Sequence, residues 1–335
     1  MGNTHLGDFS SGCLGCQNPV SPFQREARCH PFFVLSGFVL GLSLDRNKIS
    51  HWRSVWVFWL QRGLRIYPAH LVVMTAIVST LFFFRMTPNE SMTLGSSWFL
   101  RCYRTAPDLW NTCQNALLVS TNLNHITWTL RVEAIIALMF PLLHCLSRWH
   151  TRTPWHQICL LSVLFMVGFA NPHSVWIPRI YEFYLGLLLP KFLPQWQRLN
   201  KRNLRWALAI VLPLTLSASE WSPWIRLNDL LLTMAAILIL GYGMHRDSAP
   251  FWDAALTRKL GSISYGFYLW HFPVLWFSCF ALLHSGILNI SGIKTPVVTL
   301  LLAIWSISLA GLLGGLSYSF IERPFIELGR RIARQ

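Results

Sequence analysis

Charged side chains are scarce in this chain, and acidic ones are the scarcest. Asp, Glu, Lys and Arg make up 12% of its 335 residues, with 13 acidic residues against 28 Lys and Arg. Soluble globular proteins carry about 25% charged residues, so this composition excludes an ordinary soluble domain. Hydrophobic residues reach 53% and the mean hydropathy is +0.41, values that indicate a membrane protein.

The formal net charge of +15 does not indicate a nucleic-acid-binding protein. Such proteins gather their cations on one face or stripe. Here Lys and Arg occupy short stretches between long apolar runs, which is the pattern that orients membrane helices. The 17 Trp fit this interpretation, because indole rings are favoured at the headgroup level. We therefore expect membrane lipid, and no nucleic acid, as a partner.

Several signatures of soluble enzymes are also missing. By inspection the chain contains no P-loop, dinucleotide fingerprint, heptad run, low-complexity tract or internal repeat. Cys13 and Cys16 form a C-x-x-C pair without a second matching pair, so we expect no metal site. We also expect no tightly bound cofactor.

Long uncharged runs predict an all-α polytopic membrane protein. A helix needs about 20 residues to cross the hydrocarbon core, and a search for runs near that length finds nine candidates. The predicted spans are 29–44, 66–84, 126–146, 157–170, 180–190, 206–219, 230–245, 262–285 and 295–319. Glu182 interrupts one of them and Arg28 cuts off the first, so we expect these helices to be tilted, buried by neighbouring helices or extended by polar residues.

Counting cations in alternate connections predicts the orientation. One set of connections holds 19 Lys and Arg and the other holds 6. Cations stay preferentially on the cytoplasmic side, so the C-terminus is predicted to be cytoplasmic and nine crossings place the N-terminus outside. Yet residues 1–28 contain neither an apolar run nor a signal-peptide pattern. We favour a misplaced gene start and a missing upstream helix, which would bring the count to ten.

Five separated segments carry a recognisable pattern. They read FFVLSGF at 32–38, FWLQRGLRIYP at 58–68, WTLRVEAIIALMFP at 128–141, SYGFYLWHFP at 264–273 and SYSFIERPF at 317–325. Together they resemble the acyltransferase-3 family of bacterial integral membrane O-acyltransferases, and the resemblance covers about residues 31–325. It divides the chain into a non-matching polar segment 1–30, a membrane domain 31–325 and a short basic cytoplasmic tail 326–335.

The resemblance implies a membrane O-acyltransferase. Such an enzyme moves an acyl group, often acetyl, from acyl-coenzyme A to a hydroxyl of a surface or secreted glycan or a lipid-linked sugar. The expected location is the bacterial inner membrane, and the sequence leaves the oligomeric state open. The family usually has ten helices, the first with an Arg and a His that is favoured as catalytic. Neither His5 nor His30 maps to that position.

Two other functions remain open at this point. Charged groups within spans also mark the substrate pathways of transporters and carriers, although no inverted repeat is visible here. The chain is alternatively a catalytically inactive acyltransferase that lacks the first helix of the family.

Arg62, Arg65 and Tyr67 are the predicted acyl-coenzyme A site. The two arginines lie three residues apart, so on a helix they share a face at the predicted cytoplasmic boundary. Guanidinium groups bind phosphates in forked pairs, and RGLRIYP resembles the arginine motif of the family. The structural alternative is that the arginines only anchor and orient the helix. Gln61 stands where the family often has a further Arg.

Glu133 is one of two predicted catalytic residues. It falls about seven residues inside a predicted span, or ~10 Å deep, where a carboxylate is costly and functional by default. It is expected to act as a general base toward an acceptor hydroxyl or to position that hydroxyl, with Trp128 in support. The structural alternative is an ion pair with Arg131 or another buried cation. Ala134 stands where the family often has a second acid.

His271 is the second predicted catalytic residue. A neutral imidazole serves as acid or base near physiological pH. In the structural alternative it bonds a carbonyl that Pro273 leaves unpaired at a kink. Tyr265 and Tyr268 are predicted to support the site with hydrogen bonds.

Three further features have weaker interpretations. Ser36 and Gly37 lack a G-x-S-x-G elbow, so close helix packing is the favoured role. Glu322 and Arg323 precede Pro324, where an ion pair or helix stop is as plausible as substrate contact. Cys102 and Cys113 share the long outer connection, and a disulfide between them is predicted if that connection faces an oxidising periplasm.

Overall fold

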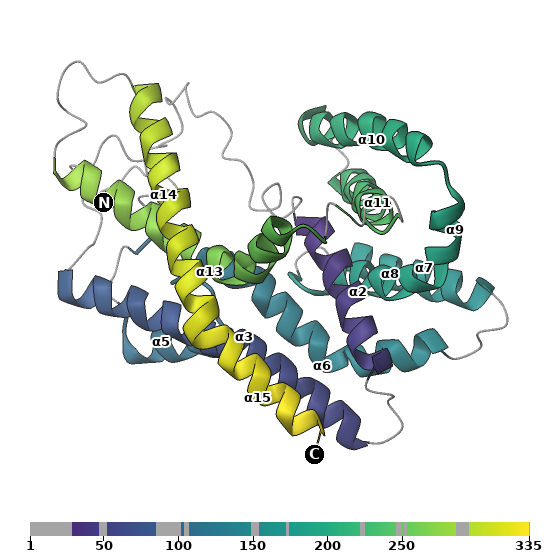
Figure 1. Cartoon of the computed structure of the whole chain (residues 1–335), viewed down its shortest axis with the longest axis horizontal. Coiled ribbons are helices and arrows are strands. Elements are labelled where there is room, and N and C mark those ends of the chain that lie inside the picture. Colours follow the sequence, from purple (N-terminus) through teal and green to yellow (C-terminus); the bar gives the residue numbers. More distant parts are fainter. Residues whose placement is uncertain are drawn as a thin grey trace, which may run out of the picture.

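The computed structural model describes most of the membrane domain. The described residues are 29–46, 52–84, 102–103, 107–148, 154–171, 174–221, 225–245, 250, 253–285 and 295–334. The predictions for His5, Cys13 and Cys16 fall outside these residues. Every regular element among the described residues is a helix, which confirms the all-α class (Figure 1).

The helices coincide with the nine predicted apolar runs. They are α2 (His30–Arg46), α3 (Trp52–Phe84), α6 (Trp128–Arg148), α7 (Pro154–Ala170), α8 (Ile180–Leu188), α10 (Lys201–Trp221), α11 (Ile225–Gly243), α13 (Ala255–His284) and α14 (Thr295–Ser317). Two short helices, α5 (Leu109–Ala116) and α9 (Leu193–Arg198), were not predicted. A π-helical turn, Tyr318–Glu322, joins α14 to the last helix, α15 (Arg323–Arg334).

Within the described ranges, four segments are long and apolar enough to cross a membrane. They are Trp52–Phe84, His125–Arg148, Ala255–His284 and Val297–Arg334. The last of these joins α14 and α15 into one rod, which crosses α13 and then lies along the first half of α3 (Figure 1). On the other side of the molecule, α2 packs against α8 and α11.

Glycines let α2 and α8 meet backbone to backbone. A Cβ added to Gly37 would overlap the carbonyl oxygen of Phe183, and one added to Gly186 would overlap that of Val34. Small residues allow this approach where water supplies no hydrophobic force between helices. The geometry confirms the packing role predicted for Gly37, and its neighbour Ser36 is buried.

A second glycine pair sets the crossing of α13 and α14. A Cβ on Gly314 would lie 2.5 Å from the amide nitrogen of Phe267. One on Gly266 would lie 2.8 Å from both the carbonyl oxygen of Gly314 and Oε1 of Glu322. The two helices therefore touch at this point, and a carboxylate fills the space that any larger residue at 266 would occupy.

Two helix prolines have their orphaned carbonyls satisfied from another element. A proline removes the hydrogen bond to the carbonyl four residues earlier, and in hydrocarbon that carbonyl needs another donor. For Pro141 this is the carbonyl of Ala137, which accepts from Nε1 of Trp59 at 3.2 Å. For Pro273 it is the carbonyl of Leu269, which accepts from Nδ2 of Asn124 at 3.3 Å.

A buried cluster of ionisable side chains joins α2, α8 and α11. Nδ1 of His30 lies 2.9 Å from Oε1 of Glu182, and Nε2 lies 3.3 Å from Oδ1 of Asp229. Arg179 donates to the same Glu182 oxygen at 3.0 Å. The predicted apolar runs contain His30 and Glu182, Arg179 and Asp229 lie just outside such runs, and the members come from segments far apart in the chain. Neighbouring helices bury Glu182 completely, as expected.

The short helix α5, in the connection between α3 and α6, packs against α3. Nε2 of the buried His70 donates to the carbonyl oxygen of Asn115 at 3.0 Å. In the same connection Cys102 is buried and Cys113 is exposed, and no disulfide joins them. The predicted disulfide is therefore wrong, because the fold holds one thiol in the core and turns the other outward.

Adjacent glycines in α14 provide a matched test of the crossing. A Cβ at Gly315 meets nothing within 4 Å, whereas one at Gly314 meets α13. Gly315→Ala is expected to stabilise the protein by up to about 1 kcal/mol, because alanine is the better helix former. Gly314→Ala is expected to destabilise it by about 1 to 2 kcal/mol through overpacking. Thermal unfolding in detergent, followed by tryptophan fluorescence, measures both; equal shifts would contradict the crossing.

Removing one carboxylate from the buried cluster is expected to cost far more than removing an exposed one. Glu182→Gln leaves Arg179 and His30 with a single carboxylate, and breaking a buried pair costs about 3 kcal/mol or more. Glu327→Gln removes an exposed partner of Arg323 and should cost less than about 1 kcal/mol. Unfolding midpoints of the two variants in the same detergent test this. Similar midpoints would show that the cluster contributes little to stability.

Candidate functional site

Arg62 and Glu133 meet in the protein interior. Arg62 lies on α3 and Glu133 one turn inside α6, and Nη1 of the arginine donates to Oε1 of the glutamate at 3.3 Å. Their side chains are 13% and 10% exposed. The structural alternative for Glu133 was an ion pair with Arg131 or another buried cation. Such an ion pair is present, and the cation is Arg62. Arg62 and Glu133, both predicted to be functional, are thus in contact. This contact is compatible with a functional role and with a structural one.

Arg65 faces a different space from Arg62. It is exposed and lines a polar pocket of about 470 Å³ at the meeting of α3, α13 and α15. The polar lining of this pocket comprises Arg65, Ser262, Tyr265, Tyr318, Glu322, Arg323, Glu327 and Arg330. The two arginines were predicted to share a face. They do so to within about 60° of rotation, but they contact different elements: Arg62 pairs with Glu133 of α6 and Arg65 lines the pocket, which we call the arginine pocket.

The π-helical turn brings Glu322 into this pocket. The amide of Arg323 donates to the carbonyl of Tyr318, five residues back, and the extra residue turns Glu322 inward. Glu322 is buried, accepts a hydrogen bond from the hydroxyl of Ser317 at 3.2 Å and lies against Gly266.

Two structural expectations for the segment around Pro324 are wrong. Glu322 and Arg323 do not pair with one another, since Arg323 bonds Glu327 at 2.9 Å on the exposed side. Nor does the helix stop at Pro324. The proline occupies the first turn of α15, where a missing amide is tolerated, and α15 continues to Arg334.

Tyr265 ties α13 to α3 beside the pocket. Its hydroxyl donates to the carbonyl of Ile66 at 2.8 Å, one residue after Arg65. Tyr67 does not line the arginine pocket. It is half-buried and packs against the apolar cluster between α3 and α13.

Tyr268 and Trp128 lie together at the start of α6. The Tyr268 hydroxyl donates to the carbonyl of Ile126 and lies 2.5 Å from the hydroxyl of Thr129. Its ring stacks on Phe32 of α2, with 6.5 Å between centroids. Trp128 packs edge-on against Phe33 at 5.8 Å. These two predicted supporting residues therefore join α2, α6 and α13.

His271 bonds its own helix. Nδ1 donates to the carbonyl oxygen of Tyr268 at 2.6 Å, and the ring stacks on Phe267 with 6.0 Å between centroids. The structural alternative for His271 is wrong in detail, because the carbonyl that Pro273 frees belongs to Leu269 and is satisfied by Asn124. With Nδ1 as the donor, Nε2 is the acceptor of a neutral ring.

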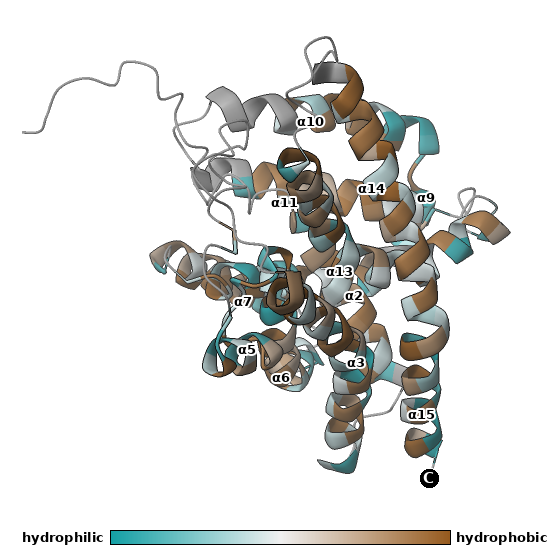
Figure 2. Ribbon diagram, turned by 90° about the vertical axis from the view of Figure 1, so that its left-hand side faces the viewer, coloured by the Kyte–Doolittle hydropathy of each residue, from teal (hydrophilic) through white to brown (hydrophobic). Residues whose placement is uncertain are grey.

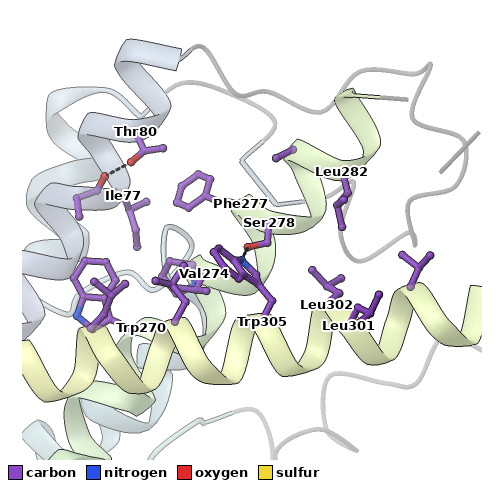
Figure 3. A pocket seen from close by; sticks show the side chains of 16 residues that line it. Ile77, Thr80, Trp270, Val274, Phe277, Ser278, Leu282, Leu301, Leu302 and Trp305 are labelled. Atoms are coloured by element: carbon purple, nitrogen blue, oxygen red, sulfur yellow. Dashed lines mark hydrogen bonds between the residues drawn. The ribbon is translucent and has the colours of Figure 1, made fainter. Parts of the chain in front are cut away.

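A second pocket, of about 760 Å³, lies on the other side of the α13 and α14 crossing. Its lining comes from α3, α13 and α14 and is almost wholly apolar (Figure 3). The indole of Trp305 donates to the hydroxyl of Ser278 at 3.2 Å at its edge (Figure 3). None of the predicted site residues lines it, and it offers no acid, base or cation.

The structure thus brings the predicted residues into three groups. Arg62 and Glu133 form a buried pair, while Arg65, Tyr265, Glu322 and Arg323 line one pocket. Tyr268 and Trp128 join α2, α6 and α13, His271 contacts Tyr268 and Phe267 of its own helix, and Tyr67 packs against the apolar core.

Sequence reasoning missed two sets of residues. Glu327 and Arg330 line the arginine pocket, and their spacing from Arg323 on one helical face was a usable signal. The buried cluster of His30, Arg179 and Asp229 could not be assembled from spacing, because its members are up to 199 residues apart.

The arrangement is an arginine-lined polar pocket beside a buried carboxylate, set among apolar helices. A family model described as "Acyltransferase domain" matches residues 28–315. The acyltransferase MdmB of Streptomyces mycarofaciens is 28% identical over 90% of this chain and 81% of its own length. No solved structure shows a significant match.

Two further relatives are longer. The O-acetyltransferase OatA of Staphylococcus aureus is 21% identical over 89% of this chain. The putative peptidoglycan O-acetyltransferase YrhL of Bacillus subtilis is 23% identical over 90% of it. This chain spans about half the length of each, 52% and 50%. Because the family model matches most of the chain, the chain belongs to the acyltransferase domain family and is a helical membrane enzyme that transfers acyl groups.

Proposed function

We propose that this enzyme moves an acetyl group from acetyl-coenzyme A to a hydroxyl of a surface or secreted glycan, or of its lipid-linked precursor, in the bacterial inner membrane. One observation carries the proposal: α3 presents Arg65 to the arginine pocket and, three residues earlier, Arg62 to the buried carboxylate of Glu133. The names of the O-acetyltransferase relatives support the reaction class.

The arginine pocket suits the phosphate-bearing end of the donor. Coenzyme A carries phosphate groups, and guanidinium groups bind phosphate with directed, charge-assisted hydrogen bonds. The pocket lies where the basic ends of α3 and α15 meet, and the distribution of cations favours the cytoplasmic side for both. The donor is made in the cytoplasm, so the proposed side and the proposed ligand agree.

The chemistry needs one base and one leaving thiol. The acceptor hydroxyl oxygen attacks the thioester carbonyl carbon, the carbon–sulfur bond breaks, and the hydroxyl proton ends on the coenzyme A sulfur. A carboxylate such as Glu133 or the Nε2 of His271 can accept that proton and pass it on. No metal or redox group enters this balance. Trp128 and Tyr268 fix the helices that carry the two bases.

Neutralising Glu133 is expected to separate catalysis from folding. Glu133→Gln keeps an oxygen for the hydrogen bond from Arg62 but removes the basic carboxylate. Loss of a general base lowers kcat by about 10²- to 10⁴-fold. Transfer of radiolabelled acetyl from acetyl-coenzyme A by detergent-purified protein measures this. Asp45→Asn, which removes an exposed carboxylate paired with His144, serves as the control. Full activity in Glu133→Gln would leave Glu133 a structural partner only.

The variant His271→Asn tests whether His271 does more than donate a hydrogen bond to the carbonyl of Tyr268. His271→Asn places an amide nitrogen near the position of Nδ1, so the bond to the Tyr268 carbonyl is preserved while Nε2 is lost. If Nε2 accepts the proton, acetyl transfer falls about 10²- to 10⁴-fold with an unchanged unfolding temperature. If instead the temperature falls and the activity per folded molecule is retained, His271 has a structural role.

A further inference from the structure

The apolar pocket extends away from the crossing of α13 and α14. Trp270 lines it one helical turn beyond Gly266 on α13, and Leu313 lines it directly before Gly314 on α14. Leu282 and Leu301 lie at the opposite end (Figure 3). The glycine contact therefore closes one end of the pocket. A volume of about 760 Å³ lies within the range of ~300 to 1,000 Å³ that is usual for ligand pockets.

The pocket is continuous with the surface that faces the lipid. Leu301 and Trp305 line it, and their side chains are 61% and 57% exposed. Both belong to a segment that is long and apolar enough to cross a membrane. In the bilayer such an exposed face contacts hydrocarbon and not water. A lipid chain can therefore enter the pocket sideways from the bilayer.

Ser278 supplies the pocket with a hydrogen-bond donor. Its hydroxyl accepts from Nε1 of Trp305 at 3.2 Å, and its own proton has no acceptor among the residues that the structure describes (Figure 3). An unsatisfied hydroxyl is costly in hydrocarbon. The pocket thus fits a ligand that is apolar along its length and carries an acceptor oxygen near Ser278.

The position of Ser278 fits the ester group of a lipid. Ser278 and Trp270 are eight residues apart on α13, which separates them by ~12 Å along the helix. One leaflet contributes about half of the ~30 Å hydrocarbon core, or ~15 Å. A chain that begins at Ser278 and ends near Trp270 therefore spans most of one leaflet.

The pocket favours a fatty-acyl chain over an isoprenoid chain. None of the described lining residues is charged, so the pocket does not hold a phosphate. A glycerophospholipid carries an ester carbonyl at the head of each chain, and this oxygen can accept from Ser278. A polyprenyl phosphate has no carbonyl there and would leave the serine proton unsatisfied.

We infer that the apolar pocket binds one fatty-acyl chain of a membrane glycerophospholipid, with the ester carbonyl accepting from Ser278 and the chain extending toward Trp270. The lipid comes from the leaflet at the C-terminal end of α13. It fills the space where α13 and α14 diverge beyond their crossing. The inference goes beyond the proposed reaction and does not depend on it.

The experiment compares two phosphatidylcholines that differ only in the carbonyl. One is a diacyl lipid with ester linkages, and the other is a dialkyl lipid with ether linkages and chains of the same length. The whole chain is delipidated in detergent and given an equal mixture of both. Native mass spectrometry then counts the lipids that each variant retains. The variants are Ser278→Ala and, as a matched control, Ser285→Ala, which removes an exposed hydroxyl at the end of the same helix.

The wild-type protein is expected to retain the ester lipid over the ether lipid by about 3- to 10-fold, the worth of one hydrogen bond. Ser278→Ala should bind the two lipids equally, and Ser285→Ala should keep the wild-type preference. Replacing phosphatidylcholine by phosphatidylglycerol should leave the preference unchanged, because no charge lines the pocket.

A pocket-filling variant separates this site from lipids bound elsewhere on the surface. Ala281→Trp places a large side chain in the pocket, whereas Ala303→Trp adds one to an exposed position of α14 that does not line it. Only Ala281→Trp should lose the lipid for which the ester is preferred.

Three outcomes would overturn the inference. One is equal retention of ester and ether lipid by the wild-type protein. Another is a preference that survives in Ser278→Ala or in Ala281→Trp. The third is displacement of the phospholipid by a polyprenyl phosphate whose own binding is lost in Ala281→Trp, which would assign the pocket to an isoprenoid chain.

Discussion

The lack of water around a membrane helix is the constraint on which the rest of this structure depends. Each polar group inside the hydrocarbon needs a partner from the protein, since an unsatisfied one costs several kcal/mol. The indole of Trp59 and the amide of Asn124 meet this need for the carbonyls that Pro141 and Pro273 release. The same requirement gathers His30, Glu182 and Asp229 into one cluster. These contacts decide which helices must be neighbours, because each joins segments that are far apart in the chain.

Close glycine crossings then decide how near those neighbours lie. Apolar side chains gain little by leaving lipid for protein, so helices associate through packing and hydrogen bonds. Gly37 and Gly186 bring α2 against α8. At this separation of the two helices the His30 side chain reaches Glu182. Gly266 and Gly314 bring α13 against α14, and the π-helical turn then places Glu322 against Gly266. The arginine pocket lies on one side of this second crossing and the apolar pocket on the other.

Apolar run length predicted the apolar helices but not the short helices α5 and α9, because hydrocarbon imposes both length and composition on a span. It also marked Glu133 and Glu182 as exceptional, since a carboxylate in such a run is costly. Apolar run length did not predict which charged residues form ion pairs. Arg62 and Glu133 are 71 residues apart, and nothing in either segment specifies the other. The family motifs led to Arg65, Tyr265, Glu322 and Arg323 separately, but only the fold shows that they line one space. Pro324 predicted a helix end because a π-helical turn cannot be read from residue types.

The two buried charge clusters differ in a way that separates structure from chemistry. In the His30 cluster both ring nitrogens face carboxylate oxygens, and His30 and Glu182 are fully buried, so no acceptor hydroxyl can reach these groups. Glu133 is satisfied by one cation only and keeps a 10% exposed side chain next to helices that line the arginine pocket. A group that must exchange a proton with substrate has to be accessible to it, whereas a group that only holds helices together can be fully enclosed. This criterion supports the proposal that the chemistry takes place on the α3 and α6 side and that the His30 cluster holds the scaffold.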